Sequence, residues 1–124
     1  MAIQIHNVNV DVANILNGIT DLKEVTPNYP DEVTTFPLAV YQTVRKTFIR
    51  NADNEETDTQ WTVTIDAFKQ QGSLTSIVDE ITNAFAHIGF VATVQQANQT
   101  GFNRSIITLT AVVDNTSGRV YQAS

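Results

Sequence analysis

An alternation of apolar and other side chains runs from Trp61 to Phe68. The apolar residues occupy positions 61, 63, 65 and 67, and Thr, Thr, Asp and Phe follow them in turn. A period of two is typical of a strand with one buried face. The pattern therefore predicts that residues 60–69 form the central strand of the protein.

Two stretches instead have the 3.6-residue period of amphipathic helices. The first predicts a helix over about 8–23, with Asn7 as its N-cap and Gly18 in its interior. The second predicts a helix that Ser73 begins as the N-cap and Gly89 ends as the C′ residue. The apolar stripe of this second helix consists of Leu74, Ile77, Val78, Ile81, Phe85 and Ile88.

The remaining segments divide into strands and connections. Residues 24–37 hold all three prolines, which predicts an extended crossing with room for a short strand at its start. Residues 51–59 are polar and acidic and predict a mobile hairpin loop, and 114–124 predict a polar C-terminal tail. Strands are predicted over 38–50, 90–94 and 105–113.

These elements predict one α+β domain spanning residues 1–124, with the order α-β-β-α-β-β. Two hairpins separated by a helical crossover favour a mostly antiparallel four-stranded sheet with both helices packed on one face. The other face would be rich in Thr and would lack a cover of its own. Such a face suggests a partner, and a solvated face with scattered aromatic residues is the alternative.

The strand over 38–50 is apolar on both faces, which predicts that both faces are covered. We expect the larger set (Leu38, Val40, Val44 and Phe48) to lie under the helices. Tyr41 and Ile49 would then lie on the open face, where a neighbouring subunit could cover them. The candidate interface consists of Tyr41 and Ile49 together with the loop acids Asp53, Glu55, Glu56 and Asp58.

Composition narrows the class of protein. The chain has 124 residues, a net charge of −6 and no Cys, and only seven basic residues. An acidic chain with few clustered cations does not favour a nucleic-acid-binding face, and thiolate chemistry is excluded. The first residues have neither a basic region nor a long apolar run, so we expect no signal peptide and no membrane span. The expected class is a soluble domain made inside a cell.

No stretch has the pattern of a catalytic or metal site. His6 and His87 are far apart in sequence, and neither has a neighbouring triad pattern. The loop acids lack the Gly and the alternating spacing of a calcium loop, and Asp66 reads as a solvated strand residue. We therefore expect no catalytic residue, no metal and no cofactor.

Four segments follow the helical start of the chain in a recognisable order: Thr35-Phe36-Pro37-Leu38-Ala39-Val40-Tyr41, Trp61 to Phe68, Ile77-Val78-Asp79-Glu80-Ile81 and Ile88-Gly89-Phe90. With the proline-spaced crossing and the hairpin with a polar tip, this order resembles tail terminator and tail-completion proteins of long-tailed bacteriophages. The resemblance covers about residues 8–113. It is a resemblance of pattern and includes no binding motif that could be transferred.

The resemblance implies a structural role in the virion. Proteins of that family form a ring, usually a hexamer, that ends polymerisation of the tail tube and joins the tail to the head. The implied partners are further copies of the chain, the major tail tube protein and a head completion or connector protein. DNA would pass through the ring without specific binding, which the acidity permits. The implied location is the head–tail junction of a virion assembled in the host bacterial cytoplasm.

Two other functions remain open at this stage. A head–tail adaptor or neck protein would share the size, fold and acidity, and only the identity of its partner would separate it. A small cytoplasmic α+β binding module or enzyme subunit would instead require a deep pocket with convergent polar groups.

Overall fold

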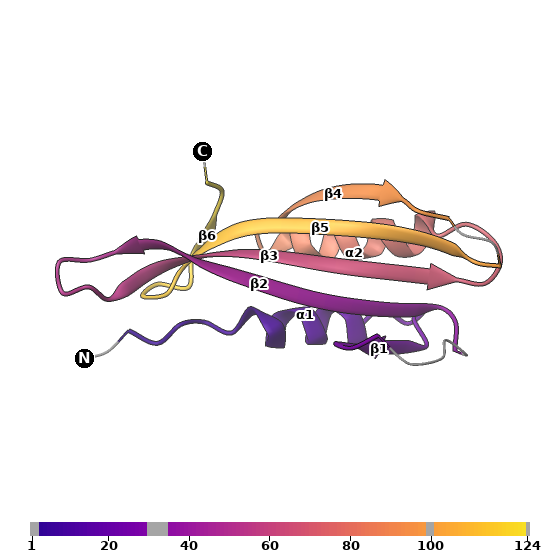
Figure 1. The fold of residues 1–124 in the computed structure, drawn as a ribbon, viewed down its shortest axis with the longest axis horizontal. Helices are drawn as coiled ribbons and strands as arrows, with labels where there is room; N and C mark the ends of the chain where they lie inside the picture. Colours follow the sequence, from indigo (N-terminus) through magenta and orange to yellow (C-terminus); the bar gives the residue numbers. More distant parts are fainter. Residues whose placement is uncertain (1–2, 30–34, 99–100, 124) are drawn as a thin grey trace.

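Two helices and six strands occur in the part of the chain that the computed structural model describes, residues 3–29, 35–98 and 101–123. The strands form one sheet in the order β1-β2-β3-β5-β4, and β6 also pairs with β5 (Figure 1). The predicted α+β class is confirmed, but the sheet has six strands instead of four. The elements are α1 (Val8–Asn17), β1 (Glu24–Thr26), β2 (Leu38–Arg50), β3 (Glu56–Lys69), α2 (Thr75–His87), β4 (Val91–Gln96), β5 (Asn103–Asp114) and β6 (Val120–Tyr121).

The two additional strands are short. β1 begins the proline-containing crossing and runs parallel to β2, with Val25 opposite Ala39; residues 30–34 of this crossing lie outside the described residues. β6 lies within the expected polar tail, and its Val120 is opposite Val113 in β5. Strands of two or three residues are too short to show an alternation of apolar and polar side chains. β1 and β6 are therefore recognised by their pairing with β2 and β5.

The centre of the sheet is built from strands that are distant in sequence. β3 leads through α2 to β4 at the edge, and β5 then pairs antiparallel with both of them. The expected helical crossover between two hairpins is therefore present, but β5 separates β3 from β4. The β2–β3 and β3–β5 ladders are both long, which makes β3 the central strand, as predicted.

Helix α1 is shorter than the sequence pattern indicated. Asn7 caps it as predicted, because the Asn7 side chain accepts a hydrogen bond from the Asn9 N–H at 3.1 Å. Gly18 is the C-cap and not an interior residue, and its N–H bonds to two carbonyls of the last turn. Ile19 is still buried, so the apolar period continues beyond Gly18. The backbone at Ile19, however, is no longer α-helical.

Helix α2 ends as its sequence predicted. Gly89 has a φ of +91°, and the N–H groups of Gly89 and Phe90 bond back to the carbonyls of Ala86 and Phe85. This is the Schellman arrangement, which a left-handed residue makes possible. At the other end Ser73 is not the N-cap, since that position falls on Leu74, but its hydroxyl accepts from the Thr75 N–H. No helix in the described ranges is long and apolar enough to cross a membrane.

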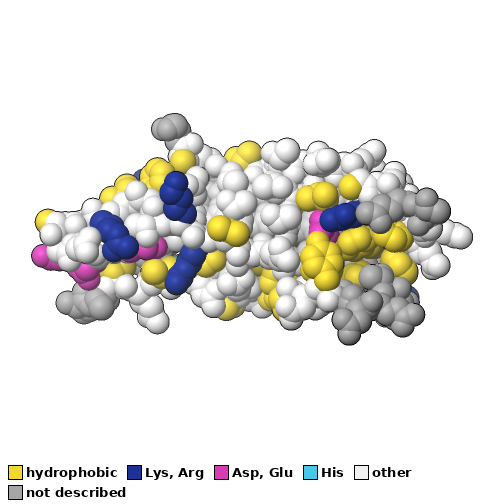
Figure 2. Space-filling view, viewed as in Figure 1, with side chains coloured by type: hydrophobic (Ala, Val, Ile, Leu, Met, Phe, Trp, Pro, Cys, Tyr) yellow, Lys and Arg dark blue, Asp and Glu magenta, His cyan; other side chains and the backbone are white. Residues whose placement is uncertain are grey.

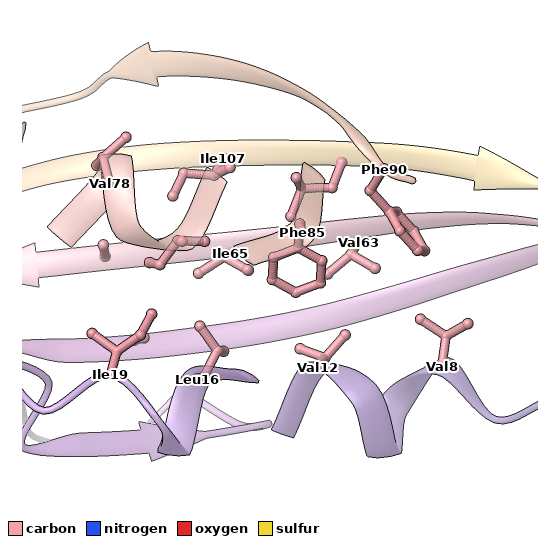
Figure 3. Close-up of a cluster of buried hydrophobic side chains, with 14 of the residues drawn as sticks. Val8, Val12, Leu16, Ile19, Val63, Ile65, Val78, Phe85, Phe90 and Ile107 are labelled. Atoms are coloured by element: carbon pink, nitrogen blue, oxygen red, sulfur yellow. The ribbon is translucent and has the colours of Figure 1, made fainter. Parts of the chain in front are cut away.

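The main core lies between the two helices and one face of the sheet (Figure 3). Phe85 of α2 is fully buried within this core. Its ring meets the Phe90 ring edge-on, with 5.8 Å between ring centroids. The apolar faces of α1 and α2 both contribute to this cluster, so the helices share one face of the sheet, as predicted. The buried strand residues in the cluster are Ala39, Trp61, Val63, Ile65, Ala67, Ile107, Leu109, Ala111 and Val113.

Candidate interaction surface

The sheet face opposite the helices is rich in threonine. In β3 and β5 the odd-numbered apolar residues belong to the main core, so the even-numbered residues point the other way. Thr62 pairs with Thr110 and Thr64 with Thr108, and all four are half-buried. Figure 2 shows this face, where uncharged polar and backbone atoms fill the centre and apolar atoms gather toward both ends. The Thr-rich open face is therefore confirmed.

The two faces of β2 are the reverse of those predicted. Tyr41 is opposite Ile65, and residues opposite each other in an antiparallel ladder share a face. Tyr41 is therefore half-buried against the main core beneath the helices. Leu38 and Val40 lie on the open face, where they form a second small cluster with Phe68. The expectation that Tyr41 lies on the open face was wrong, because both sets of β2 are apolar and only the pairing register distinguishes them.

Coverage of β2 on both faces is limited to its start. Leu38, Ala39 and Val40 are all buried, whereas the open-face residues from Gln42 onward are exposed. The prediction that the whole strand is covered on both sides was therefore wrong for a single chain. Val44 is the clearest case, since 67% of its surface is accessible.

Ile49 reaches the open face through a break in the ladder. Thr47 is opposite Thr59 and Ile49 is opposite Asp58, so Phe48 between them has no partner of its own. A bulge of this kind changes which residues share a face. Ile49 thus lies on the side away from the helices, as predicted, with 45% of its surface exposed.

The end of the β2–β3 hairpin extends beyond both helices (Figure 1). We call residues 44–60 the hairpin arm. Three of its apolar side chains, Val44, Phe48 and Ile49, are 67%, 41% and 45% exposed. The Phe48 ring meets the ring of Tyr121 in β6 edge-on, with 6.3 Å between centroids. Exposed apolar groups gathered on one projecting element form a patch that a partner would cover favourably.

The acidic connection in the arm is shorter than predicted. It comprises residues 51–55 instead of 51–59, because Glu56 to Thr59 already belong to β3. The Asn51 side chain closes the turn by accepting from the N–H groups of Asp53 and Glu55, each at 3.0 Å. The sequence did not reveal this because the strand there is polar. The mobility of the connection stays a prediction.

The four predicted interface acids have different surroundings. Asp53 is exposed in the turn, and the Glu55 carboxylate accepts from the Ile3 N–H at 3.2 Å. Glu56 accepts hydrogen bonds from the hydroxyls of Thr47 and Thr59, and these bonds lower the pKa of its carboxyl. Within the described chain no three His, Asp or Glu side chains are close enough to hold a metal ion.

Asp58 takes part in a contact that ties the arm to the end of the chain. The Tyr121 hydroxyl donates a hydrogen bond to the Asp58 carboxylate. Burial, followed by this hydrogen bond, raises the pKa of Tyr121 to about 12. β6 therefore holds the base of the hairpin arm through an aromatic contact with Phe48 and a charge-assisted hydrogen bond to Asp58.

Asp66 is buried and paired, contrary to the expectation of a solvated residue. Only 4% of its surface is exposed, and its Oδ2 accepts from the Arg104 guanidinium at 3.1 Å. The same guanidinium lies over the Phe68 ring, 5.5 Å from its centroid. Arg104 lies diagonally across the β3–β5 ladder from Asp66, and this relation could not be read without the register.

Two places among the described residues are candidates for a reaction centre, a cleft beside α2 and a surface His–Asp pair. One cleft of about 340 Å³ lies between the start of α2 and β4, where Leu74, Val78, Asp79 and Val94 contribute to its lining. His6 pairs with Asp11 at 2.5 Å on the surface, a neighbour that the sequence spacing did not indicate. Neither place combines a nucleophile with a base and an orienting group, which nucleophilic catalysis requires.

Comparison with known proteins adds no further assignment. No protein-family model matches the chain, and no curated protein matches it.

Proposed function

We propose that the protein is a structural subunit of a bacteriophage virion. Several copies, six in the family that it resembles, form a ring that caps the tail tube, ends its polymerisation and contributes to the head–tail joining interface. The observation that carries this proposal is the hairpin arm. The end of the arm extends beyond both helices, and the arm exposes Val44, Phe48 and Ile49 where a neighbouring subunit or a tube subunit could cover them.

The energetics of the arm suit assembly on a repeated template. Full burial of one Val, Ile or Phe side chain contributes about 1.5–3 kcal/mol, and these residues are already partly covered. One arm therefore supplies only a modest affinity. A tube end that presents the same site several times would bind a ring of arms much more firmly, because each contact raises the effective concentration of the next.

The charge distribution supports the same role. The chain has a net charge of −6, yet Arg45, Lys46 and Arg50, three of its seven basic residues, lie on the hairpin arm. An acidic body facing a bore would repel phosphates and let DNA slide through. The same arm also carries four acidic residues, so it presents charges of both signs and would suit a complementary surface of mixed charge on the tail tube protein or the head connector.

A tail-length assay tests the proposal. Tube subunits are polymerised with the purified wild-type protein, with Ile49→Asp or with Val10→Asp, after circular dichroism confirms that all three are folded. Val10 is the matched control because it is an exposed β-branched residue on α1, away from the arm. We expect the wild type and Val10→Asp to limit tube length, and Ile49→Asp to lose this activity because an interface tolerates an unpaired charge poorly.

Unlimited tube growth with the wild-type protein would reject the terminator role and leave the adaptor function. An equal loss of activity in Val10→Asp would reject the assignment of the arm as the contact.

A further inference from the structure

The two long edges of the sheet are protected to different degrees. Beyond its short pairing with β1, the free edge of β2 carries Arg45 and Lys46, and a bulge at Phe48 interrupts it. Charged residues and bulges are devices that prevent one sheet from pairing with another. The β2 edge is therefore poorly suited to accept a further strand.

β4 at the opposite edge has none of these features. Its sequence, Val91-Ala92-Thr93-Val94-Gln95-Gln96, contains no charged residue, no Pro and no Gly. It pairs with β5 over all six residues without a register shift, so no bulge interrupts it. Among residues 3–29, 35–98 and 101–123, no strand pairs with its outer side, and Val91 and Val94 are 55% and 45% exposed.

We propose that β4 is a pairing edge through which two copies of the chain join into one continuous sheet. A two-fold axis perpendicular to the sheet places β4 antiparallel to β4 of the second copy and keeps the helices of both copies on the same side. The side-chain alternation then allows only registers in which odd residues meet odd residues and even residues meet even ones. Two such registers lie equally near the centre of the strand. We choose the one that places Thr93 opposite Thr93 of the partner subunit and Ala92 opposite Val94 of the partner subunit, because the other register would place glutamines opposite Thr93 and Ala92.

The chemistry of β4 favours a second copy as the occupant. Because the strand is uncharged, two copies meet without like-charge repulsion and leave no charge unpaired. The register above joins Thr with Thr on one face and small apolar residues on the other, both favourable cross-strand pairs. Six residues per chain bury far less than the roughly 1,600 Å² of a standard interface, so the dimer should be weak and depend on concentration.

This inference is independent of the proposed role at the tail. A two-fold contact is complete after two copies and cannot close a larger ring by itself. It would instead link subunits of two rings or pair free subunits before assembly.

Analytical ultracentrifugation of the purified chain, from micromolar to millimolar concentration, tests the inference. We expect the wild type to shift from monomer to dimer. Thr93→Lys and Thr93→Glu should each stay monomeric, because like charges would face each other across the axis, and an equimolar mixture of the two should form a heterodimer. Val10→Lys, the introduction of a charge at an exposed residue of α1 away from both β4 and the hairpin arm, should dimerise like the wild type.

A wild type that stays monomeric throughout, or a Thr93→Lys variant that still dimerises, would overturn the inference. Failure of the mixture to form a heterodimer would overturn the proposed register. Hydrogen exchange of the wild type gives a readout that needs no variant. The β4 amides should be protected more strongly at high concentration than at low concentration, and equal protection would count against the pairing.

Discussion

Replacement of Phe85 by Ala tests whether the core has been placed correctly. Phe85 is fully buried on the face of α2 that meets the sheet, and its ring packs edge-on against Phe90 just beyond the helix (Figure 3). The site is enclosed by α1, α2 and the sheet, and these rigid elements cannot readily collapse into the space that the ring leaves. The substitution should therefore leave a cavity and remove an aromatic pair.

The magnitude follows from these two terms. A buried Phe→Ala change typically costs about 3–5 kcal/mol, and an edge-on aromatic pair accounts for roughly 0.5–1.5 kcal/mol of such a loss. Because domains of this size are stable by only about 5–15 kcal/mol, the variant should unfold at a much lower urea concentration.

Urea unfolding followed by circular dichroism measures this loss. Phe48→Ala is the matched control, since it makes the same chemical change at a residue that is 41% exposed and has one aromatic neighbour. We expect the control to lose no more than about 1.5 kcal/mol. A loss below about 1 kcal/mol for Phe85→Ala, or equal losses in the two variants, would refute the placement of α2.

Two further predictions concern the pH and the backbone. The pKa of Tyr121 is raised from 10.0 to about 12 by burial and by its bond to Asp58, so its contribution to stability is full below pH 10 and is lost as the pH rises to about 12. Urea midpoints across this range should fall less steeply for Tyr121→Phe, and parallel curves would exclude the linkage. Gly89→Ala should cost about 1–2 kcal/mol, because Gly89 has a φ of +91° and a Cβ there would lie 2.9 Å from Val120 Cγ1. Gly101 has a similar φ of +95° but open space around it, so Gly101→Ala should lose less stability than Gly89→Ala. Equal urea midpoints for the two variants would show that the contact with Val120 does not contribute to the loss.

Local patterns predicted the elements that carry strong periodicity. The alternation from Trp61 to Phe68 identified the central strand, and the stripe through Ile81 and Phe85 identified the buried face of α2. Gly89 marked the end of that helix because few other residues adopt a left-handed backbone without strain. In each case the information lies within a few consecutive residues, and tertiary contacts reinforce it.

The candidate surface was predicted less well because it depends on register. Tyr41 and Val40 are equally plausible on either face of β2 until the partner strand is aligned. The sequence predicted Tyr41 and Ile49 on the same face of β2. The bulge at Phe48 changes the alternation between them, so Ile49 lies on the predicted face although Tyr41 does not. Asp66 gave no sign of burial, because its partner Arg104 is remote in sequence and adjacent only in the ladder.

The position of β5 between β3 and β4 constrains the order in which the protein can fold. β3 and β4 both precede β5 in the chain, but they do not pair with each other. β5 lies between them in the sheet and pairs with both. Until β5 arrives, each of them presents an unsatisfied edge toward the other, and local contacts alone cannot complete the sheet. Completion of the sheet therefore requires contacts between residues that are distant in sequence. Such contacts slow folding and prolong the time during which unpaired strand edges are exposed. During synthesis the risk of aggregation would be greatest in the interval after β4 leaves the ribosome and before β5 does.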